Sequence, residues 1–154
     1  MRVNILSKLE FDKLMSHNSI TDENVEKFDN IMFISIVDTQ NKKGPYFKSD
    51  HDNVINLRFD DVEKSGEASP TQKEFTKAFS AKQAKDLYNF IKKHDEKETC
   101  IVHCMAGISR SGAVGTFVND FYKGDLDRFK RENPYISPNQ KVYRMLKEQW
   151  QNDF

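Results

Sequence analysis

The chain has 154 residues, of which 37% are hydrophobic and 12% aromatic, so it is long enough to fold around a core of its own. Lysine plus arginine and aspartate plus glutamate number 24 each, and the formal net charge is zero. A neutral chain without a basic block gives no electrostatic basis for binding nucleic acid or an anionic membrane. We therefore expect a single domain over residues 1–154, in which any anion is bound at a local site.

The N-terminal segment carries charge too early to contain the apolar core of a signal peptide, and no apolar run approaches transmembrane length. The two cysteines, Cys100 and Cys104, are too few and too close along an expected strand to form a disulfide framework. Together with the cysteines, His17, His51 and His94 show no metal-ligand spacing. These features favour a cytoplasmic protein without a metal or a cofactor.

Apolar runs and helical stripes alternate along the chain. Strands are expected at 3–6, 31–37, 54–59 and 99–103, because these runs are short, apolar and rich in β-branched residues. Helices are expected at about 8–17, 22–28, 81–94, 110–123, 125–132 and 138–150. Polar connections are expected at 38–53 and 63–71.

Helix starts are marked by capping residues. Ser7 with Glu10, and Ser80 with Gln83, have the form of capping boxes. Ser137, followed by a proline, predicts the cap of the last helix, and Thr21 predicts the cap of a short one.

This alternation predicts an α/β fold with a central, mostly parallel sheet of about four to five strands flanked by helices. In such sheets the ligand crevice lies beyond the carboxyl ends of the strands. The loops after Val37, Phe59 and His103 would open there, so Asp60 and Asp61 can meet Cys104.

The segment from Ile101 to Gly112 contains the residues that indicate a chemical function. A β-branched strand leads into Cys104, five residues follow, and Arg110 and Ser111 begin a helix. The helix N-terminus and a nearby cation can lower a cysteine pKa to ~3.5–7.5, which makes the nucleophilic thiolate. Successive backbone N–H groups form an anion nest, and arginine adds a bidentate fork for phosphate oxygens. Ser111 can donate its hydroxyl toward the sulfur.

These residues resemble the signature of the cysteine-based protein phosphatases, which is His-Cys, five residues, then Arg-Ser or Arg-Thr. His103, Cys104, Gly107, Arg110 and Ser111 match it. The string at 106–111 is similar to the compact dual-specificity branch.

Similarity extends to 59–62 upstream and to 133–139 downstream, so it covers roughly the C-terminal two-thirds of the chain. The resemblance implies a tyrosine or dual-specificity phosphatase-like fold.

The resemblance also implies roles. Cys104 would attack phosphorus and form a phosphocysteine, Arg110 would hold the equatorial oxygens, and Asp61 would act as general acid and base. His103 would orient the loop, and Ser111 would assist the sulfur as leaving group. The substrate-binding residues would be Met105, Ala106, Gly107, Ile108, Ser109 and Arg110.

Two assignments stay open at this point. Asp60 is adjacent to Asp61 and could be the acid instead, because the alignment can shift by one residue. Cys100 could be a resolving thiol that protects Cys104 from oxidation, whereas a strand cysteine is more often a small buried hydrophobe.

The expected activity is hydrolysis of phosphotyrosine, and of phosphoserine and phosphothreonine as further substrates, in proteins or peptides. Phosphate, sulfate or vanadate should bind in the loop. Sulfur transfer and arsenate reduction use a similar loop and are the alternative reactions, and a phosphoprotein-binding pseudophosphatase is the non-enzymatic one. The loop contains no lysine, which disfavours a phosphoinositide substrate.

Overall fold

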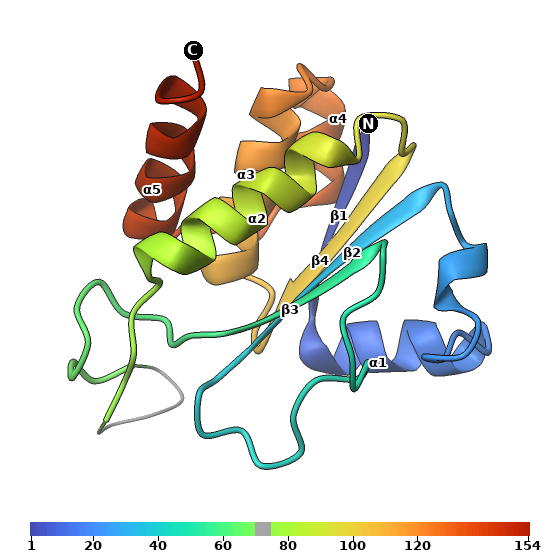
Figure 1. Cartoon of the computed structure of the whole chain (residues 1–154), viewed down its shortest axis with the longest axis horizontal. Helices are drawn as coiled ribbons and strands as arrows, with labels where there is room; N and C mark the ends of the chain where they lie inside the picture. The colour runs from blue at the N-terminus through green and yellow to red at the C-terminus, as the bar shows by residue number, and fades with distance from the viewer. Residues whose placement is uncertain (70–74) are drawn as a thin grey trace.

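The computed structural model describes residues 1–69 and 75–154, so the predicted connection at 63–71 ends outside the described residues. In chain order the elements are β1 (Arg2–Ser7), α1 (Lys8–His17), the 3₁₀ turn η1 (Val25–Lys27), β2 (Ile31–Val37), β3 (Val54–Arg58), α2 (Ala81–Lys93), β4 (Thr99–Cys104), α3 (Arg110–Phe121), α4 (Leu126–Glu132) and α5 (Gln140–Gln151). Helices cover both faces of a twisted sheet (Figure 1). Within the described ranges, no helix combines the length and the apolar composition needed to cross a membrane.

The sheet has four strands in the order β1-β4-β2-β3, and every neighbouring pair is parallel. The predicted α/β class and parallel sheet are therefore confirmed, at the lower end of the expected strand number. β4 lies between β1 and β2, where it is hydrogen-bonded on both edges and covered on both faces. This central position explains why its last five residues, Cys100 to Cys104, are all buried.

The two faces of the sheet pack against different helices. Helices α2, α3 and α5 lie over one face, and α1 lies on the other (Figure 1). Side chains alternate along a strand, so Cys104 belongs to the first core, while Ile101 packs with Phe11 of α1 in the second. Consecutive residues His103 and Cys104 accordingly point to opposite sides of the sheet.

The capping boxes predicted from Ser7 and Ser80 are both present. The predicted cap of the last helix is wrong, because α5 begins at Gln140 and its N-cap is Asn139, whose side chain accepts from the N–H of Val142. Ser137 is used otherwise, since its N–H donates to the Ile108 carbonyl.

The cap predicted at Thr21 is also wrong. The N-cap of η1 is Asn24, and its side-chain oxygen instead accepts from the Thr21 N–H at 2.8 Å.

Candidate active site

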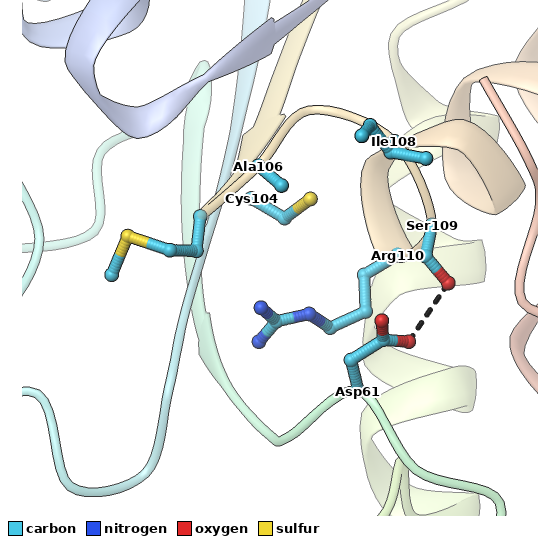
Figure 2. Close-up of a pocket in the computed structure, with 7 residues that line it drawn as sticks. Asp61, Cys104, Ala106, Ile108, Ser109 and Arg110 are labelled. Atoms are coloured by element: carbon cyan, nitrogen blue, oxygen red, sulfur yellow. Dashed lines mark hydrogen bonds between the residues drawn. The ribbon is translucent and has the colours of Figure 1, made fainter. Parts of the chain in front are cut away.

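The candidate site lies at the carboxyl edge of the sheet, where β4 ends at Cys104 and α3 begins at Arg110. A pocket of about 180 Å³ opens there. Its walls are Asp61, Cys104, Met105, Ala106, Ile108, Ser109 and Arg110. Figure 2 shows the sulfur of Cys104, the guanidinium of Arg110 and the carboxyl of Asp61 around one hollow. Residues from two distant parts of the sequence therefore meet as expected, although Gly107, His103 and Ser111 do not line the hollow itself.

The loop between β4 and α3 is held by its carbonyl groups. The Met105 carbonyl accepts from the N–H of Lys8, the Ile108 carbonyl from Ser137, and the Ser109 carbonyl from Asn139 and from Ala113. These hydrogen bonds hold the loop against the start of α1, the segment before α5 and the first turn of α3.

Gly107 lets this loop lie against the end of β1. Its φ is +73°, a conformation in which a side chain is strained. A Cβ at this position would lie 2.6 Å from the backbone nitrogen of Ser7 and 2.7 Å from the carbonyl carbon of Leu6. Glycine is therefore required both for the turn and for the close approach.

Cys104 is 2% exposed, and its sulfur lies 3.0 Å from the hydroxyl of Ser111. Ser111 is fully buried in the first turn of α3. The N-terminus of a helix favours a negative charge, so both the helix and the hydroxyl can stabilise an anionic sulfur.

Arg110 is fixed by one of its terminal nitrogens. Its Nη1 donates to the Phe59 carbonyl at 2.8 Å and lies 2.7 Å from a carboxylate oxygen of Asp38. Its Nε is buried and has no hydrogen-bond partner among the described residues. A donor that is buried and unpaired is costly unless a ligand satisfies it, so the guanidinium is arranged to bind an anion with the side opposite its anchor.

Asp38 was not among the predicted site residues. It directly follows the apolar strand β2, and this position at the carboxyl edge is the signal that identifies it in retrospect.

Asp61 is the predicted acid that lines the pocket. Its Oδ1 accepts from the Ser109 hydroxyl at 2.8 Å, drawn as the dashed line in Figure 2, and from the Asn139 side-chain amide at 3.0 Å. Both of these hydrogen bonds fall on Oδ1. Asn139, which also caps α5, was missed, although its place in the 133–139 stretch was a sequence signal.

Asp60 points elsewhere and is fully buried. Its carboxylate accepts from the backbone N–H and hydroxyl of Thr39, at 3.0 and 2.7 Å, and from the N–H of Lys77 at 2.7 Å. This carboxylate holds the segments after β2 and before α2 onto the end of β3. The geometry therefore favours Asp61 over Asp60 as the group that faces a substrate.

His103 lies beneath the loop, on the α1 side of the sheet. Its Nε2 is 2.6 Å from the Ser35 hydroxyl, its Nδ1 is 3.4 Å from the Cys104 carbonyl, and its ring packs 4.2 Å from that of Phe11, centre to centre. Burial lowers the pKa of His103 from 6.5 to about 4. The ring is therefore neutral near neutral pH, and Ser35 is a contact that sequence reasoning did not anticipate.

Cys100 is a fully buried free thiol on β4, and burial raises its pKa. Four residues of strand span about 13 Å, roughly twice the Cα separation that a disulfide bridges. With β4 intact, Cys100 is out of reach of Cys104, which agrees with a packing role.

This architecture is that of the dual-specificity and tyrosine phosphatases. Human DUSP28 aligns with a TM-score of 0.52 and 16% identity, over 97% of this chain and 92% of that chain. The PTP-2 phosphatase of Cydia pomonella aligns with a TM-score of 0.50 and 16% identity, over 96% and 85% of the two chains. A scan against models of protein families finds no match, and neither does a search of curated proteins. At this level of identity the likeness defines the fold.

Proposed function

We propose that this chain is a cysteine-dependent phosphatase that hydrolyses phosphotyrosine in proteins or peptides, with phosphoserine and phosphothreonine as further substrates. One observation carries the proposal: the Cys104 sulfur, the Arg110 guanidinium with its unpaired Nε, and the Asp61 carboxyl surround one pocket. These are a nucleophile, an anion-binding fork and a proton donor, which are the groups that phosphate transfer from an ester requires.

In the proposed first step the Cys104 thiolate attacks phosphorus. A P–S bond forms as the P–O bond to the alcohol breaks, and Asp61 gives its proton to the departing oxygen. Arg110 and the loop N–H groups bind the equatorial oxygens throughout. In the second step water attacks the phosphocysteine, Asp61 takes its proton, and Ser111 donates to the departing sulfur. The products are the alcohol and inorganic phosphate, and the thiolate is regenerated.

The walls of the pocket favour an aromatic ester. Met105, Ala106 and Ile108 are apolar, and among the residues that the structure describes Arg110 is the only lysine or arginine that lines it. Apolar walls suit the ring of a phosphotyrosine, whereas a phosphoinositide headgroup needs further cations for its additional phosphates. Phosphate, sulfate and vanadate are expected to bind the same loop.

The proposal also covers the extent of the catalytic domain and the compartment in which it acts. We propose that residues 1–154 form a single catalytic domain that acts in the cytoplasm. The alternative of arsenate reduction requires a second thiol within reach of the nucleophile, and Cys100 is not within reach.

The proposal is tested by the Cys104→Ser variant. It should hydrolyse para-nitrophenyl phosphate and a phosphotyrosine peptide at below a few per cent of the wild-type rate, because the hydroxyl replaces the only proposed nucleophile. Vanadate binding by isothermal calorimetry should be largely retained. Turnover well above that level would contradict the covalent mechanism, and a wild-type chain that binds vanadate without turnover would instead support a pseudophosphatase.

A further inference from the structure

A second hollow lies on the other side of the loop at 105–109 between β4 and α3, which we call the anion loop. It has a volume of about 440 Å³ and is bounded by the end of β1, the outer side of the loop and the segment between α4 and α5. We call it the flanking groove, and its apolar walls include Leu6, Ile108, Pro134, Tyr135 and Ile136. Its size is within the range of sites that bind small ligands or side chains.

The flanking groove adjoins the catalytic pocket. Ala106 and Ile108 line both hollows, so a ridge formed by one short stretch of loop separates them. A molecule that places a phosphate at Cys104 can therefore extend across this ridge into the groove. Nothing in the proposed mechanism uses the groove.

The surface of the groove suits an apolar occupant. The Tyr135 and Ile108 side chains are 82% and 40% exposed, which is high for large hydrophobic residues next to a pocket. Asn133, a polar residue that lines the groove, already has hydrogen-bond partners. Its side-chain amide donates to the Val3 and Phe129 carbonyls, and its side-chain oxygen accepts from the Ile5 N–H. An apolar group placed there leaves no polar atom of Asn133 without a partner.

The charges around the groove disfavour an acidic occupant. Within residues 1–69 and 75–154, the charged residues that line it are Glu10 and Glu132, with no lysine or arginine among the lining residues. The Glu132 carboxylate is paired with Arg2 and Arg128, and that of Glu10 accepts from the Ser7 N–H. A phosphate or carboxylate placed there would meet the acidic side chains of Glu10 and Glu132.

We infer that the flanking groove binds an apolar side chain that neighbours the phosphorylated residue of a peptide substrate, an inference that rests on the proposed function. In an extended peptide, side chains on one face repeat about every 7 Å, and the ridge is one loop segment wide. The apolar residue therefore lies within two positions of the phosphorylated one. Tyr135 and Ile108 contact this apolar side chain. The residues next to the phosphorylated one therefore decide which peptides bind well.

The test compares phosphotyrosine peptides that differ at one position. Each of the two residues on either side is set to glycine, leucine or aspartate, and binding to the Cys104→Ser variant is measured by fluorescence anisotropy. At one position leucine should bind about tenfold more tightly than glycine, the range expected when an apolar group fills a pocket, and aspartate should bind no better than glycine.

Two variants in the Cys104→Ser background locate the effect. Tyr135→Ala should abolish the preference for leucine, because it removes a wall of the groove. Leu126→Ala removes a side chain that is 50% exposed at the far end of α4 and should leave the preference unchanged. Equal binding of all peptides, a preference for aspartate, or a preference that survives Tyr135→Ala would overturn the inference.

Two further measurements distinguish a failure of the proposed phosphatase activity from a failure of the inference about the groove. Para-nitrophenyl phosphate has no flanking residue, so Tyr135→Ala in the otherwise wild-type chain should hydrolyse it at the wild-type rate. Absence of this hydrolysis in both chains would contradict the proposed phosphatase, while the peptide-binding comparison still decides on the groove. A dimer in light scattering that Tyr135→Ala dissociates would show a second copy in the groove and overturn the inference.

Discussion

At the scale of single residues, two adjacent aspartates have opposite surroundings. Asp61 lines the pocket with one oxygen bound by Ser109 and Asn139, whereas both oxygens of Asp60 are bound inside the protein. Sequence reasoning could place the pair at the carboxyl edge but could not separate its members, because a shift of one residue exchanges buried and exposed directions. The distinction depends on Thr39 and Lys77, which are remote in the sequence.

Asp61→Ala should therefore lower kcat by ~10²–10⁴ for an ester with a poor leaving group, and by much less for one with a good leaving group. A good leaving group departs without a proton, so the general acid matters less. The measurement is kcat for a series of aryl phosphates of increasing phenol pKa. If the steep dependence on leaving group appears in Asp60→Ala and is absent in Asp61→Ala, the assignment is reversed.

His103 makes stability depend on pH. Its pKa is about 4 in the folded chain, below the ordinary value of 6.5, because burial disfavours the charged ring. Between these values the unfolded chain binds a proton that the folded chain does not. The contribution of His103 to the free energy of unfolding should fall by about 3 kcal/mol as pH falls from 6.5 toward 4.

The measurement is urea unfolding across that range of pH. His103→Gln should flatten the slope, because glutamine does not titrate. The control position is His17, which is exposed, and His17→Gln should retain the wild-type slope. Equal slopes for His103→Gln and the wild type would contradict a neutral buried ring.

At the scale of elements, the anion loop depends on its neighbours for its shape. Gly107 lies against the end of β1, and the carbonyl bonds from Ser137 and Asn139 come from the segment before α5. The motif from His103 to Ser111 predicted the loop, since these residues are consecutive. The partners that hold it could not be predicted, because they come from both ends of the chain.

Gly107→Ala should lower the free energy of unfolding by more than the roughly 1–3 kcal/mol of a strained backbone, because the new Cβ also meets the Leu6 and Ser7 backbone. Vanadate affinity should fall with it. Gly66→Ala is the matched control: its φ is also positive, at +90°, and nothing lies within 4 Å of a Cβ there. Equal losses in the two variants would show that contact with β1 is unimportant.

Asp60 links three segments, so its removal should act on stability before chemistry. Asp60→Asn replaces a buried acceptor for three N–H and O–H donors with a group that must present a donor of its own. A loss of about 3 kcal/mol in the free energy of unfolding is expected. Asp61→Asn, at a partly exposed position, should lose activity with a change in stability below about 1 kcal/mol. Similar stability losses in both would contradict this division.

At the scale of the whole molecule, the apolar periodicity was sufficient to predict the class of fold. The run at 31–37 coincides with β2, and the capping boxes at Ser7 and Ser80 start α1 and α2. The order of the strands could not be predicted, because an apolar run does not indicate which strand will pair with it. The cap at Asn139 instead of Ser137 shows the same limit, because tertiary hydrogen bonds with the loop decide where α5 begins.

The pairing of β1 with β4 has a consequence for the newly made protein. Ser7 is the register partner of Cys104, although almost two-thirds of the chain lies between them. During synthesis β1 must wait without its neighbour until β4 has emerged, and contacts so distant in sequence form slowly. Because Gly107 lies against Leu6 and Ser7 at the end of β1, the loop after Cys104 takes its folded shape only when the first strand pairs with the last.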